Sequence, residues 1–222
     1  MSKTKGLTAK RRKIQKRNHP RKGSSIKADP LRSLELIQRV MVLLKDKPRN
    51  LCLFTLGINT AYRANELVSL KIKDVMHLGI GDNLTRKQSK NQEYRQIALN
   101  GAGFHALQHW LSLHPDPRPE KALFISRKTR KAITVPYVSQ MVKGWCHSAG
   151  GNGNYSSHTL RKTWGYQQRV WKGTDLSLLV RAYGHSSEAQ TLEYLGILPD
   201  EIRDIYLNME LCITSIGGMI GR

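Results

Sequence analysis

One tyrosine, Tyr194, follows polar residues whose chemistry suits attack on a phosphodiester. A tyrosine hydroxyl has an ordinary pKa of about 10, so it needs a proton acceptor and positive charge nearby to act as a nucleophile at neutral pH. Histidines precede it at His158 and His185, and arginines at Arg63 and Arg161. Two guanidinium groups can hold the non-bridging oxygens of a phosphate in a fixed, bidentate geometry. These residue types therefore predict nucleophilic displacement at phosphorus.

The same residues belong to short motifs that follow one another along the chain. In order, the motifs are Thr60-Ala-Tyr-Arg63-Ala-Asn-Glu66-Leu67, Gln88-Ser-Lys90-Asn, Ser157-His158-Thr-Leu-Arg161-Lys, Tyr183-Gly-His185-Ser-Ser, and Tyr194 nine residues after His185. Each motif alone is common in helices and loops. Their order and spacing, over roughly residues 31 to 211, resemble those of the tyrosine recombinase (phage-type integrase) family.

The resemblance implies an α+β fold that is mainly helical, with a small antiparallel β-sheet. It also implies an enzyme, a site-specific DNA recombinase of the integrase or invertase type. In that family the tyrosine, here Tyr194, attacks the scissile phosphate and leaves a 3′-phosphotyrosyl link and a free 5′ hydroxyl. A hydroxyl from a second strand then reverses the step. Since each exchange conserves a phosphodiester, no metal and no cofactor is expected.

The resemblance also assigns roles to the cations around Tyr194. Arg63, Arg161 and His185 would stabilise the charge that builds on the phosphoryl oxygens. His158 would be the acid/base partner of Tyr194. These assignments predict that all five side chains meet in one pocket.

Two further roles concern a lysine and a carboxylate. Lys90 would protonate the departing 5′ oxygen, and Lys87, three residues earlier, could take its place. Glu66 stands three residues after Arg63, a helical spacing at which the carboxylate can reach back to fix the guanidinium.

Apolar periodicity predicts the elements that position the first motif. Asp29-Pro30 is a helix-start signal, and Leu34, Ile37, Met41 and Leu44 recur at spacings of three and four. A short apolar helix is expected from Leu51 to Leu56. Gly57 and Asn59 should break it, so that a new helix begins at Arg63.

The pattern changes period between Lys71 and Leu99, which predicts a short antiparallel sheet with Lys90 near a hairpin tip. Further helices are expected over 103–113, from Pro136 to Cys146, from an N-cap at Ser156 or Ser157, from Leu176 to Ala182, from Glu188 to Leu195, and from Pro199 onward. Gly184 suits the turn that would point His185 into the site.

The chain carries 37 Lys and Arg residues against 16 Asp and Glu residues, a net charge of +21 that favours a polyanionic partner. Charge alone is equally typical of a ribosome-associated or other RNA-binding protein. The three cysteines are scattered and form no Cys-x-x-Cys pair, which favours a reducing, cytoplasmic location over a disulfide framework. No apolar run approaches the roughly 18 to 20 residues of a membrane span, so no membrane partner is expected.

We expect three segments: a basic arm at residues 1–28, a catalytic domain at 29–212 and a loose tail at 213–222. The arm contains eleven basic residues and no acidic one, so it should be disordered when free. It is either a solubilising tail or an arm that binds the DNA backbone. The DNA-binding residues would then include Lys10, Arg11, Arg12, Lys13, Lys16 and Arg17.

The resemblance further implies double-stranded DNA as partner, a homotetramer on two paired sites, and association with the nucleoid. Most members of the family carry a helical domain ahead of the catalytic one, so this chain resembles the short members. Accessory DNA-bending proteins are a possible requirement. His105 and His109 stand one helical turn apart, but they lack a third ligand, and no metal site is predicted.

Two other functions fit the same motifs. One is a non-catalytic DNA-binding regulator that retains the fold. The other is a type IB topoisomerase, which relaxes supercoils by the same tyrosine chemistry. The filled set of reactive residues argues against the regulator, and the Gly184-His185-Ser-Ser sequence follows the recombinases rather than the topoisomerases.

Overall fold

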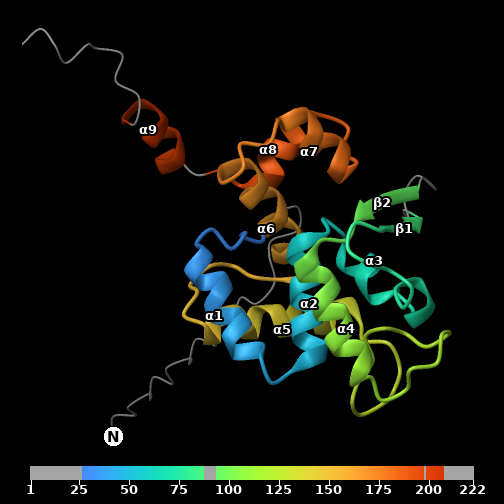
Figure 1. Ribbon diagram of the computed structural model, residues 1–222. Coiled ribbons are helices and arrows are strands. Elements are labelled where there is room, and N and C mark those ends of the chain that lie inside the picture. The colour runs from blue at the N-terminus through green and yellow to red at the C-terminus, as the bar shows by residue number, and fades with distance from the viewer. Residues whose placement is uncertain (1–26, 88–93, 198, 208–222) are drawn as a thin grey trace, which may run out of the picture.

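The computed structural model describes residues 27–87, 94–197 and 199–207, and over these the chain is mainly helical with one two-stranded sheet (Figure 1). The helices are α1 (Leu34–Leu44), α2 (Pro48–Asn59), α3 (Ala64–Val68), the 3-10 turn η1 (Ile72–Asp74), α4 (Gly101–Ser112), α5 (Val135–Ser148), α6 (Ser157–Val170), α7 (Leu176–Tyr183), α8 (Glu188–Leu195) and α9 (Pro199–Leu207). The strands are β1 (Asn83–Lys87) and β2 (Tyr94–Ala98). The predicted fold class is confirmed.

Helix α2 is the centre of the body, in contact with α1, α4, α6 and α3. Its sequence is apolar on nearly every side, and Leu53, Phe54 and Leu56 are fully buried. A helix that is hydrophobic all round belongs inside a protein. The other helices of the lower body in Figure 1 pack around it, and they form one large hydrophobic cluster.

Helix α1 begins later than predicted. Its N-cap is Ser33, whose hydroxyl accepts a hydrogen bond from the Leu36 amide. The Asp29 carboxylate is engaged elsewhere, because it accepts from the Asn154 amide at 2.8 Å. The phase of the helix is also shifted: Val40 is buried, whereas Met41 is 36% exposed.

Gly57 does not end a helix, contrary to the prediction. Helix α2 continues through it to Asn59. A Cβ atom at position 57 would lie 2.6 Å from Cδ1 of Leu160 on α6. The glycine therefore lets α6, which carries two of the candidate site residues, approach α2 closely.

The predicted sheet is confirmed only in part. Strands β1 and β2 pair antiparallel, with Lys87 opposite Tyr94. Ile72 to Asp74, which the period change had placed in the sheet region, form a 3-10 turn instead. Lys90 belongs to the connection between the strands and lies outside the described residues.

Helices α7 and α8 form a separate layer, at the upper right of Figure 1. Its interior is a second hydrophobic cluster, made of Ala61, Leu179, Tyr183 and Leu195. Gly184 ends α7 in the left-handed conformation, at φ +62°, as predicted. The chain therefore turns sharply just before His185.

Helix α9 stands out from the body in Figure 1. Its first turn is held through Glu201, which bonds to Arg32 and Tyr166. Its apolar residues Ile202 and Tyr206 are exposed. No described helix is both long and apolar enough to cross a membrane.

Candidate active site

Arg161 is the most buried cation of the candidate site, with 2% of its surface exposed. Helix α6 begins at a capping box formed by Ser156 and Thr159, so Arg161 lies just past the first turn. Its guanidinium donates to two backbone carbonyls, those of Ala61 and Tyr183, the latter at 2.7 Å. These bonds join the segment before α3, the start of α6 and the end of α7 at one side chain.

Arg63 is the N-cap of α3, and Glu66 holds it there as predicted. The Glu66 carboxylate accepts from the Arg63 amide and lies 3.7 Å from the guanidinium. Glu66 is buried whereas Arg63 is about a quarter exposed. The arrangement fixes the base of the Arg63 side chain and leaves its end facing a pocket.

Tyr183 connects the site residues to one another. Its ring stacks on His185 at a centroid distance of 4.8 Å and an interplanar angle of 14°. It meets the edge of Tyr194 at 5.2 Å, and the Arg161 guanidinium lies 4.7 Å from its centre. Its hydroxyl donates to the Arg161 carbonyl at 3.0 Å. Tyr183 opens the motif that contains His185, but no role was predicted for its own side chain, so its central position was missed.

Gly165 makes room for that tyrosine. A Cβ atom at position 165 would lie 1.8 Å from the Tyr183 hydroxyl oxygen, which no side chain could tolerate. The glycine in the middle of α6 is therefore the reason that the Tyr183 ring can reach the backbone of that helix.

His185 is oriented by a threonine that the sequence analysis also missed. Its Nδ1 atom lies 2.9 Å from the hydroxyl oxygen of Thr191, a fully buried residue of α8. This contact and the stacking on Tyr183 fix the orientation of the His185 ring, which also lines a pocket. The spacing of six residues between His185 and Thr191 was visible in the sequence, but it matches no local motif.

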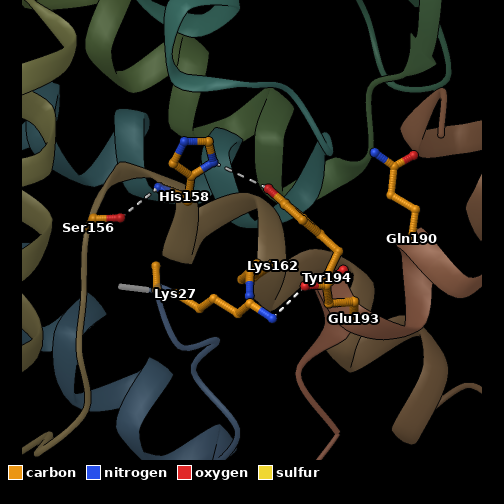
Figure 2. A pocket seen from close by; sticks show the side chains of 8 residues that line it. Lys27, Ser156, His158, Lys162, Gln190, Glu193 and Tyr194 are labelled. Carbon is orange, nitrogen blue, oxygen red and sulfur yellow. Dashed lines mark hydrogen bonds and ion pairs between the residues drawn. The ribbon is translucent and has the colours of Figure 1, made fainter. Parts of the chain in front are cut away.

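Tyr194 lies on α8 and directs its hydroxyl toward His158, as Figure 2 shows. The oxygen is 3.4 Å from Nδ1 of His158. Partial burial and the positive charges of Arg161, Lys162 and Arg63 lower the pKa of the His158 imidazole. A neutral imidazole at this place can accept the tyrosine proton.

The predicted residues meet at one pocket of about 430 Å³. It is lined by Arg63, His158, Arg161, Gly184, His185, Ser186, Gln190 and Tyr194. The five side chains that the sequence grouped together are thus brought together. Lys90 and the basic arm from Lys10 to Arg17 lie outside the described residues, and for Lys87 only the backbone is described.

Lys162, next to Arg161, places its ammonium 5.1 Å from the centre of the Tyr194 ring. The sequence motifs did not predict a role for this lysine.

His105 and His109 are exposed on α4, outside the pocket. No cluster of three or more potential metal ligands occurs within residues 27–87, 94–197 and 199–207.

Comparison with known proteins places this geometry in a family. The model of the phage integrase family matches residues 33–200. The probable integrase/recombinase YoeC of Bacillus subtilis (strain 168) is 34% identical over 180 residues, which are 80% of this chain and 94% of YoeC. The tyrosine recombinase XerC of Caldanaerobacter subterraneus subsp. tengcongensis is 30% identical over 161 residues, 71% of this chain and 44% of XerC.

Solved structures share the fold. A crystal structure of the XerA recombinase superposes with a TM-score of 0.68 at 22% identity, covering 86% of this chain and 66% of XerA. The XerH site-specific recombinase, bound to a palindromic difH substrate after cleavage, gives a TM-score of 0.65 at 26% identity and covers 82% and 53% of the two chains. The chain thus spans nearly all of YoeC but about half of the XerC and XerH proteins.

Proposed function

The chain belongs to the phage integrase family of tyrosine recombinases, and from this premise we propose that it exchanges DNA strands at specific sites through a covalent link to Tyr194. One observation carries the assignment of the nucleophile. The Tyr194 hydroxyl faces His158 in a pocket that Arg63, Arg161 and His185 also line. A tyrosine, a proton acceptor and three phosphate-binding cations in one place supply what attack on a phosphodiester requires.

In the proposed step, the Tyr194 oxygen attacks the phosphorus and transfers its proton to His158. A bond from Tyr194 to the 3′ phosphate forms while the bond to the 5′ oxygen breaks. That oxygen leaves as a hydroxyl after taking a proton, for which we propose Lys90, with Lys87 as the alternative donor. A 5′ hydroxyl from another strand then attacks the same phosphorus and releases Tyr194. The number of phosphodiester bonds is conserved, so no nucleotide needs to be hydrolysed.

The arginines and His185 would act on the phosphoryl oxygens. Charge on these oxygens increases as the pentacoordinate transition state forms, and donors held in place beforehand stabilise it without reorganisation. Arg161 is preorganised by its two backbone carbonyls and His185 by Thr191. Glu66 does the same for Arg63.

We further propose that the partner is double-stranded DNA and that four copies act on two paired sites. XerH is bound to a palindromic difH substrate, and a two-fold symmetric site calls for two copies of a protein. The basic residues of the arm, together with Lys87, would bind phosphates without reading the sequence. We also propose that accessory DNA-bending proteins assist binding.

A nicked suicide duplex tests the proposal. The protein is incubated with duplexes that carry the DNA next to its own gene, and any adduct is separated on a denaturing gel and mapped by mass spectrometry. We expect a covalent adduct at Tyr194, which then joins an added second duplex bearing a free 5′ hydroxyl. DNA binding with no adduct would support the regulator instead. A protein that forms the adduct and relaxes a supercoiled plasmid, but never joins a second duplex, would support the topoisomerase.

The pH dependence of adduct formation tests the role of His158. Because its pKa is lowered from the ordinary 6.5, more than half of the imidazole should be neutral at pH 6.5. The single-turnover rate should therefore fall as the imidazole becomes protonated, and the midpoint of this decline should lie below pH 6.5. A rate that already halves at or above pH 6.5 would contradict the role. His158→Gln should be slow and lack this acidic decline.

A further inference from the structure

A second hollow of about 420 Å³ adjoins the candidate active site, on the side reached by the N-terminal segment. It is lined by Lys27, Ala28, Ser156, His158, Lys162, Gln190, Glu193 and Tyr194 (Figure 2). His158, Gln190 and Tyr194 also line the pocket that holds the arginines. Any chemical group bound in this hollow would therefore lie directly beside a phosphate that Tyr194 attacks in the adjoining pocket.

Lys162 is the unusual residue of the hollow. Its side chain lines the space although only 6% of the residue is exposed. Its ammonium faces the Tyr194 ring, and among the described residues no carboxylate or other acceptor lies within bonding distance of it. Lysine is rarely buried to this degree without a partner, because an ammonium loses its hydration on burial.

The carboxylates nearest to Lys162 have other partners. Glu193 forms an ion pair with Lys27, and both side chains are more than half exposed. Asp29 accepts a hydrogen bond from the Asn154 amide. Burial lowers the pKa of the Lys162 ammonium, and the charges of Lys27 and Arg32 lower it further; the charges of Asp29 and Glu193 offset this only in part. An anion in the hollow would supply the hydrogen-bonding partner that the described residues do not.

We propose that this hollow is a second phosphate site, in which Lys162 binds the DNA backbone phosphate next to the one that Tyr194 attacks. The inference deepens the proposed function and rests on it. Phosphates follow one another at short, regular intervals along a strand, so a phosphate held by Arg63 and Arg161 brings a neighbour close to Tyr194.

Two other groups can complete the site. The Ser156 hydroxyl oxygen accepts from the His158 amide, which leaves its own proton available to a phosphate oxygen. Lys27 reaches the hollow from the end of the segment predicted as the basic arm, and its ammonium lies at the surface. One buried cation, one hydroxyl and one surface cation would then surround the bound phosphate, and they would fix the strand next to the reacting phosphate.

The salt dependence of DNA binding tests the site without requiring catalysis. Lys162→Met keeps the apolar stem and removes the charge, and Lys45→Met is the matched control, because Lys45 caps the far end of α1 and lines neither pocket. The DNA is a duplex of the sequence next to the gene. The negative slope of the logarithm of the binding constant against the logarithm of the salt concentration should be less steep by about 0.9 in Lys162→Met. It should be unchanged in Lys45→Met and Lys162→Arg. An unchanged slope in folded Lys162→Met would overturn the proposal.

A neutral phosphate analogue, methylphosphonate, can locate the contact. Two duplexes are made, and in each one methylphosphonate replaces one of the two phosphates that flank the cleaved phosphate. One of the two substitutions should slow adduct formation by the wild-type protein and have no additional effect on Lys162→Met. If both proteins respond equally to both substitutions, Lys162 does not bind either neighbour and the proposal fails. Failure to form any adduct would count against the role of Tyr194, whereas the salt slope would still decide whether Lys162 binds a phosphate.

Discussion

Tyr194→Phe should abolish the covalent DNA adduct and leave DNA binding intact. The substitution removes only the hydroxyl oxygen that lies 3.4 Å from His158, and the ring contacts with Tyr183 and His185 can persist. A half-buried hydroxyl contributes on the order of 1 kcal/mol to the free energy of unfolding, so the variant should fold. The measurement is the amount of adduct on a denaturing gel, beside a gel-shift assay of binding to the same duplex.

Tyr206→Phe is the matched control for that experiment. Tyr206 is 79% exposed on α9 and is the other tyrosine near the C-terminal end of the described chain. Its variant should form the adduct at the wild-type rate. If instead Tyr194→Phe still forms an adduct, another residue is the nucleophile and the assignment of the pocket is wrong.

Arg161→Lys should lower the rate of adduct formation by roughly a hundredfold to a thousandfold, the usual effect of removing one preorganised donor from a site of this kind. An ammonium cannot bond to the Ala61 and Tyr183 carbonyls in the planar, forked geometry of a guanidinium and still face a phosphate. The carbonyl that loses its partner is buried, so the free energy of unfolding should also fall, by about 1 to 3 kcal/mol. Single-turnover kinetics and urea denaturation measure the two effects.

Arg49→Lys separates the two effects. Arg49 is also a buried arginine that donates to a backbone carbonyl, that of Ile125 at 2.7 Å, but it does not line the active-site pocket. Arg49→Lys should lower the free energy of unfolding and leave the rate of adduct formation unchanged. Equal losses of rate in the two variants would mean that Arg161 acts only through the fold.

The sequence predicted features that depend on neighbouring residues. Arg63 at the start of a helix, Gly184 in the left-handed turn and the helix that carries Tyr194 each follow from local capping or periodicity, and all are confirmed. The same local rules misplaced two boundaries. Asp29 is drawn to Asn154 rather than capping a helix, and Gly57 is required for contact with Leu160 rather than for a break.

The missed site residues share a physical reason. Tyr183, Thr191 and Lys162 matter because of what they contact, and those partners come together only when α6, α7 and α8 pack. Neither hydrophobic periodicity nor a short motif predicts these tertiary contacts. The arginines and histidines could be found because the order and spacing of their motifs resemble those of a known family, whereas the contacts of Tyr183 cannot be read from its place in a motif.

The division of the apolar interior into two clusters affects how the molecule opens. The large cluster around α2 must come apart for the chain to unfold, whereas α7 and α8 rest on the small one around Tyr183 and Leu195. Releasing that helical pair exposes few apolar side chains, so its amide protons should exchange with solvent through local fluctuations rather than through global unfolding. We therefore expect Tyr194, the proposed nucleophile, to lie on a segment that opens locally while the rest of the protein stays folded.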